Sequence, residues 1–426
     1  MVVLTQRKWL KRTKNRAKLK ADYCRLRFTQ TGVKGTYTME LTYTDEEQAF
    51  RLQVRQWLVG NLPETPLKSF DTQEGFEQHR QWEKTLASGN WGMVTWPKEY
   101  GGRGCNLIEW LIFEEEYYRA GAPLRVNQNG IFLLGPTLME YGTDEQKQRF
   151  ISAMASGDEI WAQGWSEPGA GSDMAAIRSK ATRDGDEYVI NGQKIWSTRA
   201  VFADWVFCMF RTDPDSKRHH GLSFVFVPLD AEGVTVRPID QLNGLPGFAE
   251  IFFDNVRVPV SNRLGEEGDG WSIAMSTAGF ERGLMLRSPA RFQQAAKNLM
   301  GLYRAKRNDI LDLSIEDAVV RCYMDAEAYA LSTYQTASRL MSGGQIGAES
   351  SCNKIFWSEL DIKIHDTAMR LLGARGELEP DSEDASAELG SWLDGFLFAQ
   401  SGPIYAGTNE VQRNIIAERM LGMPRK

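Results

Sequence analysis

Two neighbouring stretches decide the fold of this chain: WAQGWSEPGAGSDM (Trp161–Met174) and DGDEYVINGQKIWST (Asp184–Thr198). The first is rich in Gly and other small residues, which let backbone N–H groups approach a polar or anionic ligand closely. The second alternates apolar and polar residues around Asn191-Gly192, a dipeptide typical of a two-residue hairpin turn. We predict a loop followed by a hairpin that presents Trp196 and two hydroxyl residues to a flat, polar ligand. The same pattern also suits a surface loop beside a core tryptophan.

Together the two stretches resemble the flavin-binding signature of the acyl-CoA dehydrogenase family. In that family TEPxAGSD is followed further along the chain by NGxKxWIT, and here the corresponding segments read SEPGAGSD (Ser166–Asp173) and NGQKIWST (Asn191–Thr198). Ser166 stands where the family has Thr, and Ser197 stands where it has Ile between Trp and Thr. Because the match is long and ordered, it is more specific than a single glycine motif. The resemblance covers residues 39–426.

The composition is that of a large chain with a substantial core and no membrane span. Of the 426 residues 42% are hydrophobic, yet no apolar run approaches the roughly 18 residues that cross a bilayer. The cysteines are odd in number and show no CxxC spacing, so neither a disulfide framework nor a zinc site is indicated. A reducing compartment, the cytoplasm, is therefore expected. The four histidines lack metal-ligand spacing, and His219 and His220 are expected to be loop residues.

The first 38 residues differ in charge from the rest. They hold 11 Lys or Arg and one Asp, whereas the remainder holds 39 basic and 55 acidic residues. Such asymmetry is typical of a basic arm for nucleic acid or of an organelle presequence. Since Met39 begins a segment that resembles the usual start of family members, we expect residues 1–38 to be an over-extended reading frame and to be poorly ordered. The acidic remainder argues against nucleic-acid binding.

Helical signals dominate the segment after residue 38. Thr44 with Glu47 makes a capping box in front of a segment with helical rhythm, and Thr143 with Gln146 makes another. The Glu114–Glu116 triplet is expected on a solvated helix face with one buried member. The predicted helices are Gly75–Ser88, Ile108–Ala120, Gly135–Tyr141 and Thr143–Ala155.

Short strand candidates follow at close spacing, separated by turn residues. Their Val, Phe and Trp content suits a pleated, partly buried surface, and the spacing favours a small barrel or sandwich. The candidates are Ile177–Thr182, Glu187–Ile190, Gln193–Ser197, Trp205–Arg211, Leu222–Pro228, Val234–Pro238 and Ala249–Val258.

Helices then return and continue to the end. Ser314 and the acidic residues after it predict the cap of a long helix. Apolar positions in Lys354–Leu372 fit a buried bundle face, with Gly373 as the helix stop. The predicted fold class is α+β. It comprises a helical N-terminal domain at 39–158, a β-barrel or sandwich domain at 159–268 and a helical C-terminal domain at 269–426. The resemblance implies that the C-terminal domain is a four-helix bundle.

The resemblance implies α,β-dehydrogenation of an acyl-CoA thioester to the trans-2-enoyl-CoA. This reaction needs a base for the α-proton and an acceptor for a hydride from Cβ. Protein side chains cannot accept hydride, so a cofactor is obligatory, and the resemblance names FAD, which takes the hydride at N5. It also implies that the electrons pass to an electron-transferring flavoprotein.

The catalytic base is the point at which this chain departs from many family members. They carry a Glu in an IYEGT motif, but Ile404–Thr408 reads IYAGT, and the methyl group of Ala406 cannot accept a proton. A subset of the family, including the isovaleryl- and long-chain-type enzymes, carries the Glu on an earlier helix, directly before an Arg. Glu281 and Arg282 stand at that place. We therefore predict Glu281 as general base and Arg282 as a supporting residue on the substrate side.

The resemblance assigns further contacts position by position. The signature stretches would contact the flavin ring, and Ser172 would also touch the acyl-CoA. LGARG at 372–376 stands where the family has LGGxG, which reaches the adenosine half of FAD in a neighbouring subunit. The family's RxxFG motif, whose Arg binds the FAD pyrophosphate, is not reproduced at 303–313, so no residue is assigned that role. The predicted cofactor-binding residues are Gln163, Trp165, Ser166, Gly171, Ser172, Trp196, Ser197, Thr198, Leu372, Gly373, Gly376, Gly407, Thr408 and Glu410.

Three functions stay open at this point. The first is an FAD-dependent dehydrogenase, the second an acyl-CoA oxidase in which O₂ reoxidises the flavin. The third is a non-catalytic partner subunit of a heteromeric dehydrogenase, which Ala406 favours and Glu281 opposes. The resemblance implies a homo- or heteromeric dimer or tetramer, and branched, dicarboxylic or ring-bearing acyl-CoAs as substrates, without fixing the length of the acyl chain.

Overall fold

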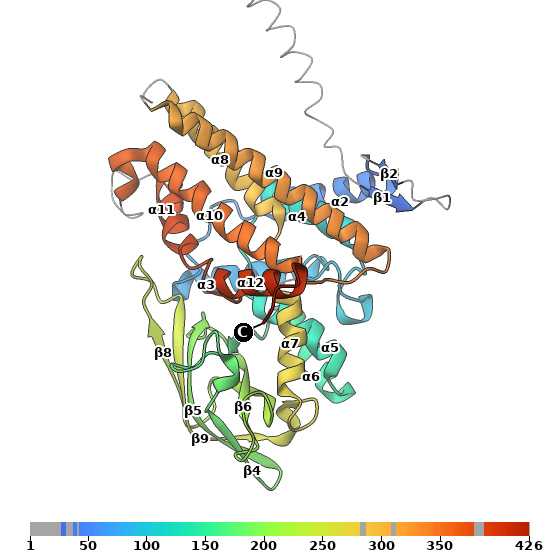
Figure 1. Ribbon diagram of the computed structural model, residues 1–426, viewed down its shortest axis with the longest axis vertical. Coiled ribbons are helices and arrows are strands. Elements are labelled where there is room, and N and C mark those ends of the chain that lie inside the picture. Colours follow the sequence, from blue (N-terminus) through green and yellow to red (C-terminus); the bar gives the residue numbers. More distant parts are fainter. Residues whose placement is uncertain are drawn as a thin grey trace, which may run out of the picture.

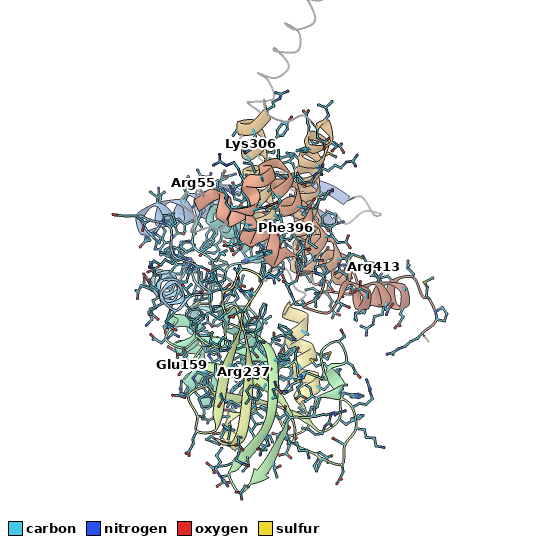
Figure 2. The ribbon with its side chains drawn as sticks, turned by 90° about the vertical axis from the view of Figure 1, so that its left-hand side faces the viewer. Arg55, Glu159, Arg237, Lys306, Phe396 and Arg413 are labelled. Carbon is cyan, nitrogen blue, oxygen red and sulfur yellow. The ribbon has the colours of Figure 1, made fainter. Side chains whose placement is uncertain are left out.

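The described part of the chain is helical, then rich in strands, then helical again. The computed structural model describes residues 27–30, 37–40, 42–281, 287–307, 312–378 and 387–425. In Figure 1 the strands of the middle part of the chain gather at the lower end of the molecule and the long C-terminal helices at the upper end. Figure 2 shows the same division from the side, with Glu159 and Arg237 in the lower part and Lys306 and Phe396 in the upper part. This order confirms the predicted fold class.

An aromatic core holds the first helical region together. Trp91 and Trp110 are buried in it, and Trp91 stacks on Phe113 at 5.7 Å between ring centroids. The capping boxes predicted at Thr44 and Thr143 are both present. The elements are α2 Asp45–Asn61, α3 Gln73–Ser88, the 3₁₀ turn η1 Lys98–Tyr100, α4 Leu107–Arg119, the π-helical segment η2 Asn129–Leu134, α5 Gly135–Tyr141 and α6 Asp144–Ser156.

The prediction of a solvated face for Glu114–Glu116 is wrong. Glu114 and Glu116 are only 8% and 1% exposed, so two of the three carboxyl groups face the interior. Glu116 forms ion pairs with Arg51 at 2.8 Å and Arg55 at 3.0 Å, both on α2. Helix α4 also contacts the C-terminal bundle, and a helix covered on several sides buries positions that a two-faced pattern would leave in solvent.

The strands of the middle part of the chain form one eight-stranded sheet in the order β10-β7-β6-β4-β5-β9-β8, with β3 paired to β6. The pairs β3–β6 and β4–β6 are parallel, and the other pairs are antiparallel. β3 was not predicted, because its sequence was assigned to the small-residue loop. The strands are β3 Trp161–Gly164, β4 Lys180–Asp184, β5 Glu187–Thr198, β6 Trp205–Arg211, β7 Leu222–Pro228, β8 Val234–Ile239, β9 Phe248–Pro259 and β10 Arg263–Leu264.

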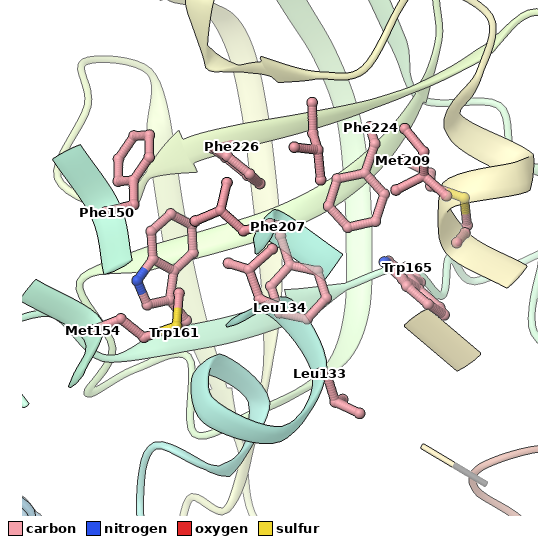
Figure 3. Packing of buried hydrophobic residues seen from close by; sticks show 14 of the residues in the cluster. Leu133, Leu134, Phe150, Met154, Trp161, Trp165, Phe207, Met209, Phe224 and Phe226 are labelled. Atoms are coloured by element: carbon pink, nitrogen blue, oxygen red, sulfur yellow. The ribbon is translucent and has the colours of Figure 1, made fainter. Parts of the chain in front are cut away.

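The central strands β6 and β7 are covered on both faces. Their residues are buried along almost the whole length, the pattern of strands that lie between two layers. On one face Phe207, Phe224 and Phe226 pack against Leu134 and Phe150 from the first helical region (Figure 3). On the other face the alternate residues of β6 and β7 join a second cluster with residues of β5 and β9.

Asn191-Gly192 lies inside β5 and not in a hairpin turn, so this prediction is wrong. β5 pairs with β9 over its whole length, and the register shifts between Ile190 and Gly192, which marks a bulge. The hairpin that joins β4 to β5 turns at Gly185 and Asp186. A Cβ on Gly192 would lie 2.3 Å from the hydroxyl oxygen of Ser179. Glycine at this position therefore permits the close approach of Ser179 inside the sheet. The same Asn-Gly sequence is also typical of a turn, so the sequence does not distinguish the two roles.

The second helical region packs around Phe292, Ile364 and Trp392. Asp312 caps its longest helix by accepting a hydrogen bond from the backbone N–H of Ser314 at 2.8 Å, so the prediction of Ser314 as the cap is wrong. Gly373, with a φ of 58°, ends α10 as predicted. The elements are α7 Gly270–Glu281, α8 Pro289–Lys306, α9 Leu313–Met341, α10 Ser350–Leu372, η6 Gly373–Glu377, α11 Ala387–Ala399, α12 Asn409–Ile415 and the π-helical segment η7 Ile416–Met420.

The basic N-terminal segment contains a small β-structure. β1 (Arg27–Gln30) and β2 (Tyr37–Glu40) form an antiparallel pair, and β1 lies beside α9. Residues 1–26 and 31–36 lie outside the described residues, and the expectation that the segment 1–38 is poorly ordered stays a prediction. Among the helices that the structure describes, none is both long enough and apolar enough to cross a membrane.

Candidate functional site

A buried glutamate fixes the start of the small-residue loop that follows β3. The carboxylate of Glu167 accepts hydrogen bonds from the backbone N–H groups of Arg178 at 2.7 Å and Ser179 at 3.0 Å. Its backbone also exchanges two N–H···O bonds with Ala170, which close a tight turn. Beyond that turn residues 171–172 are exposed, so the loop offers small side chains and backbone groups to a ligand.

Lys194 connects this loop to β5. Its Nζ lies 2.8 Å from Oε1 of Glu167 and donates to the carbonyl oxygen of Met209 at 2.7 Å. Burial on its own would raise the pKa of Glu167, but the Lys194 ammonium and the hydrogen bonds hold that pKa below its usual value. We did not single out Lys194 in the sequence. Lys194 lies on the same face of β5 as the buried residues Tyr188 and Ile190, so the ordinary alternation of the strand turns it inward.

The end of β5 presents an aromatic ring to solvent beside the same loop. Trp196 is 57% exposed and has a φ of 61°, a conformation that bulky L-residues seldom adopt. The backbone N–H of Ile195 donates to the carbonyl oxygen of Ser166 at 2.9 Å, so the indole and the loop are neighbours. Thr198 is half-buried. Ser197 is fully buried, and its hydroxyl has no hydrogen-bond partner among the residues described.

The IYAGT segment precedes α12 and is held by a buried lysine. Lys354 Nζ donates to the carbonyl oxygen of Gly402 at 2.9 Å and to Oδ1 of Asn409 at 2.8 Å. Ala406 has a φ of 57°. Thr408 is the N-cap of α12, because its hydroxyl accepts a hydrogen bond from the backbone N–H of Val411. This capping role alone accounts for a Thr at that position.

Glu281 is the last described residue of α7, and Arg282 lies outside the described residues. Helix α7 packs against β7 on one side and against η2 and α5 on the other. Thr277, one turn before Glu281, lies 2.9 Å from Thr137 between the two hydroxyl oxygens. The structure therefore fixes the helix that carries the predicted base.

The remaining predicted cofactor contacts fall into two groups. Gln163 and Trp165 flank the small-residue loop, and the Trp165 indole N–H is buried without a partner in the described part of the chain. The second group lies apart from the sheet. Leu372 packs in the core of the C-terminal helices, and Gly376 follows it in η6. Glu410 is exposed and pairs with Arg413 at 3.5 Å. None of these assignments is tested by the geometry of a single chain, and they stay predictions.

A metal centre finds no support in the described residues. Within the ranges that the structure covers, no group of His, Cys, Asp and Glu could hold a metal ion. His219 and His220 lie in the exposed turn between β6 and β7, as expected, where the His219 ring approaches Trp271 at 5.7 Å.

Family models match almost the whole chain after residue 43. The acyl-CoA dehydrogenase N-terminal domain matches residues 44–158, the middle domain residues 162–256 and the C-terminal domain residues 268–421. Among individual proteins, the acyl-CoA dehydrogenase IpdE1 of Mycobacterium tuberculosis is 40% identical over 391 residues, which cover 89% of this chain and 98% of the relative.

Solved structures show the same similarity. The Tcur3481–Tcur3483 steroid ACAD has a TM-score of 0.81 and 32% identity, with 91% of this chain and 100% of the other chain covered. The ChsE4–ChsE5 complex of Mycobacterium tuberculosis has a TM-score of 0.76 and 33% identity, with the same coverage of each chain. With three matching domain models and full-length relatives of this identity, the chain belongs to the acyl-CoA dehydrogenase family of oxidoreductases, which act on CH–CH groups.

Proposed function

We propose that this protein binds FAD and oxidises an acyl-CoA thioester to the trans-2-enoyl-CoA, with Glu281 taking the α-proton. One structural observation carries the proposal. Ala278, on the last turns of α7, and Trp165, directly before Ser166, belong to the same buried cluster. Figure 3 shows Trp165 within that cluster. A single core therefore fixes both the helix that carries the base and the loop that we expect to contact the flavin.

The residues at this edge of the sheet fit the ring system of a flavin. An indole as exposed as that of Trp196 leaves a flat apolar face available for stacking. Cβ atoms added to Gly169 or Gly171 would meet nothing within 4 Å, so the loop leaves open space in front of its backbone. Ser166 and Thr198 contribute partly exposed hydroxyl groups. FAD, when bound there, would accept the hydride that leaves Cβ of the substrate.

Glu281 is the carboxylate that this chain supplies in place of the one that Ala406 lacks. A general base works best when its pKa lies near the working pH, and shielding from water raises the pKa of a carboxyl group toward that range. We propose that the bound acyl-CoA provides this shielding and that Arg282 supports the position of Glu281. The ion pair of Lys194 and Glu167 orients the loop and β5 but takes no part in proton transfer.

A second candidate is a subunit of a heteromeric dehydrogenase. The names of two similar structures each give two polypeptides, ChsE4–ChsE5 and Tcur3481–Tcur3483. No residue of this chain is assigned to the FAD pyrophosphate. This gap also favours a second chain that completes the cofactor site. In this candidate Glu281 keeps its role if the present chain is the catalytic one.

We further propose that the electrons pass to an electron-transferring flavoprotein and that the protein works in the cytoplasm. The four cysteines that the structure describes, Cys105, Cys208, Cys322 and Cys352, are all unpaired, which supports a reducing compartment.

Anaerobic titration tests the proposal. The purified protein should be yellow, and an acyl-CoA should bleach the flavin absorbance in the absence of oxygen. A colourless protein that gains flavin only when a paralogous chain is co-expressed would favour the heteromeric subunit. Flavin that no acyl-CoA bleaches, with or without such a partner, would contradict the proposed dehydrogenation. Rapid reoxidation of the bleached flavin by O₂ would indicate an oxidase instead.

A further inference from the structure

The end of β5 has a backbone that residues other than glycine seldom adopt. Trp196 has a φ of 61°, and Arg199, which directly follows the strand, has a φ of 50°. Residues 196–199 are called the end segment of β5 below. Two left-handed residues within four positions store strain, and such a backbone persists only where the surrounding structure holds it. The contacts of the end segment therefore decide whether it keeps this shape.

This backbone also decides which side chain of the end segment faces solvent. Ile190 and Lys194 lie an even number of positions before Trp196 and are buried, so a regular alternation would bury Trp196 as well. The pairing of β5 with β9 shifts its register between Lys194 and Ser197. Beyond the shift Ser197 is buried and Trp196 is exposed. The irregular end segment is thus what turns the indole outward, to the face that we propose for the flavin ring.

An ion pair anchors the end segment to the first helical region. Nε of Arg199 donates to Oδ1 of Asp71 at 2.7 Å, and the two side chains are only 16% and 9% exposed. The guanidinium also lies 3.8 Å from the centroid of the Phe70 ring. Asp71 and Phe70 belong to the turn before α3. The position of the end segment therefore depends on a carboxylate from a distant part of the chain.

The loop between β8 and β9 completes this anchor. Oδ2 of Asp71 accepts a hydrogen bond from Nε2 of Gln241 at 2.9 Å. The backbone N–H of Arg199 donates to the carbonyl oxygen of Gly247, in the same loop, at 3.0 Å. Both carboxylate oxygens of Asp71 are thus in use, and Arg199 is held by its side chain and by its backbone. Neutralising Asp71 would weaken both connections of its carboxylate.

The identity of residue 199 indicates that its side chain matters. Asn or Gly would adopt a φ of 50° with less strain than Arg. An arginine at this position is therefore unfavourable for the local backbone. The ion pair with Asp71 is what an Asn or a Gly here could not supply, because neither carries a charge nor reaches as far.

We propose that Asp71 and Arg199 are positioning residues for the flavin, which hold the end segment so that Trp196 and Thr198 face the ring. This inference rests on the proposed function. Neither residue of the pair touches the ligand itself. Thr198 lies directly before Arg199, and Trp196 lies three positions before it, so a displacement of Arg199 moves both predicted contacts.

Three substitutions test the pair. Asp71→Asn keeps the shape of the side chain but removes its charge. Arg199→Asn suits the left-handed backbone but is too short for the ion pair, whereas Arg199→Lys keeps a positive charge on a long side chain. The first measurement is the Kd of FAD for each apoprotein, from the quenching of flavin fluorescence. We expect binding about tenfold weaker or more in Asp71→Asn and Arg199→Asn, and within about threefold of the wild type in Arg199→Lys.

A second measurement separates positioning from stability. It is the limiting rate of anaerobic flavin bleaching with FAD in excess, using the acyl-CoA that bleaches the wild type fastest. A contact that only joins two parts of the fold affects unfolding by urea but not this rate, whereas a misplaced ring slows the reaction in a fully occupied site. We expect the limiting rate to fall about tenfold or more in Asp71→Asn and Arg199→Asn, as for other losses of alignment.

Arg257→Gln is the matched control. Arg257 forms exposed ion pairs with Asp184 at 2.8 Å and with Glu187 at 2.9 Å, at the opposite end of β5. Its substitution should change neither the Kd of FAD nor the limiting rate. Urea unfolding establishes that each variant is folded. Because Asn suits the backbone of position 199, Arg199→Asn keeps the test decisive if Asp71→Asn does not fold.

The outcomes separate this inference from the proposed function. A wild-type Kd and a wild-type rate in Asp71→Asn and Arg199→Asn overturn the inference, even if their stability is lower, and leave the dehydrogenation intact. Equal losses in Arg199→Lys and Arg199→Asn overturn the role of the ion pair. If the wild type binds FAD but no acyl-CoA bleaches it, the dehydrogenation fails and the Kd of FAD alone decides the inference. A wild type that binds no FAD, alone or with a paralogous chain, overturns both.

Discussion

Lys194 and Glu167 form an ion pair closed to solvent, with 2.8 Å between Nζ and Oε1 and side chains that are 0% and 7% exposed. Glu167 begins the small-residue loop, and Lys194 lies on β5 two positions before Trp196. The pair therefore fixes the two elements that we propose to face the flavin ring. Since a buried charge is tolerated only while it is paired, this contact makes the shape of the site depend on two side chains that touch no ligand themselves.

Lys194→Met should be strongly destabilising. The substitution keeps a linear side chain but leaves the Glu167 carboxylate buried without its partner, which costs about 3–5 kcal/mol of the free energy of unfolding. We also expect less FAD per protein after purification. Urea unfolding and the flavin-to-protein absorbance ratio measure both effects. Arg321→Met breaks an exposed pair with Asp317 and should change neither quantity appreciably. A Lys194→Met variant as stable as the wild type would mean that the buried pair does not fix the loop.

Glu281→Gln should retain FAD but lose acyl-CoA bleaching. The amide has nearly the shape of the carboxyl group but cannot take a proton, and general-base catalysis is worth about 10²–10⁴ in rate. Stopped-flow absorbance under anaerobic conditions measures the rate. Glu316→Gln, at an exposed position of α9, is the matched control and should bleach normally. If Glu281→Gln bleaches at the wild-type rate, the base lies elsewhere.

Ala406→Glu in the Glu281→Gln background should restore part of the bleaching. Ala406 already has a φ of 57°, so a Glu there adds little backbone strain beyond that of Ala. The carboxylate would stand where many family members carry their base. The same absorbance measurement applies, with Ala406→Gln as the control that adds bulk without a base. A folded, yellow double variant without any bleaching would show that position 406 does not face the α-carbon in this chain.

Much of the fold could be predicted because its signals are local. Capping boxes at Thr44 and Thr143 gave two helix starts, since a cap depends only on side chains within one turn. The bounds of β6 and β7 were also correct, because strands buried on both faces are continuously apolar. The domain boundaries after residues 158 and 268 stay predictions.

The cap at Asp312 was missed by two positions, whereas two other errors concern contacts between segments distant in sequence. Asn191-Gly192 has the same local signal in a hairpin turn and inside a strand, and only pairing with β9 distinguishes them. Likewise, the burial of Glu114 depends on α8, which no pattern within α4 reveals. At the candidate site the sequence predicted that the loop and Trp196 lie together, whereas the buried partners Lys194 and Lys354 were missed. A lysine side chain is usually exposed, and the residues next to it in the sequence do not indicate that a distant residue accepts a hydrogen bond from it.

Ser197→Ala should leave the protein as stable as the wild type or stabilise it by about 1 kcal/mol, because the Ser197 hydroxyl is buried without a partner among the described residues. Thr137→Val is the matched control. It removes a buried hydroxyl that donates to the carbonyl oxygen of Leu133 at 2.7 Å and contacts Thr277, and it should be destabilising. Urea unfolding of both variants without FAD checks this. A clear loss of FAD affinity in Ser197→Ala would instead support the predicted contact of this residue with the cofactor.

Glu114 should make the protein less stable as the pH rises through neutrality. Burial raises the pKa of its carboxyl group from 4.5 to about 7. The folded state therefore binds this proton more tightly than the unfolded state. The stabilising effect is complete below the unfolded pKa and is lost as the pH rises through about 7, a change of about 3 kcal/mol. Glu114→Gln cannot ionise and should remove this part of the pH dependence, so that its stability relative to the wild type increases between about pH 5 and pH 8. Urea unfolding at each pH measures the difference, and Glu64→Gln, at an exposed position after α2, should follow the wild-type curve. Parallel curves for Glu114→Gln and the wild type would mean that Glu114 titrates as an ordinary exposed carboxyl group.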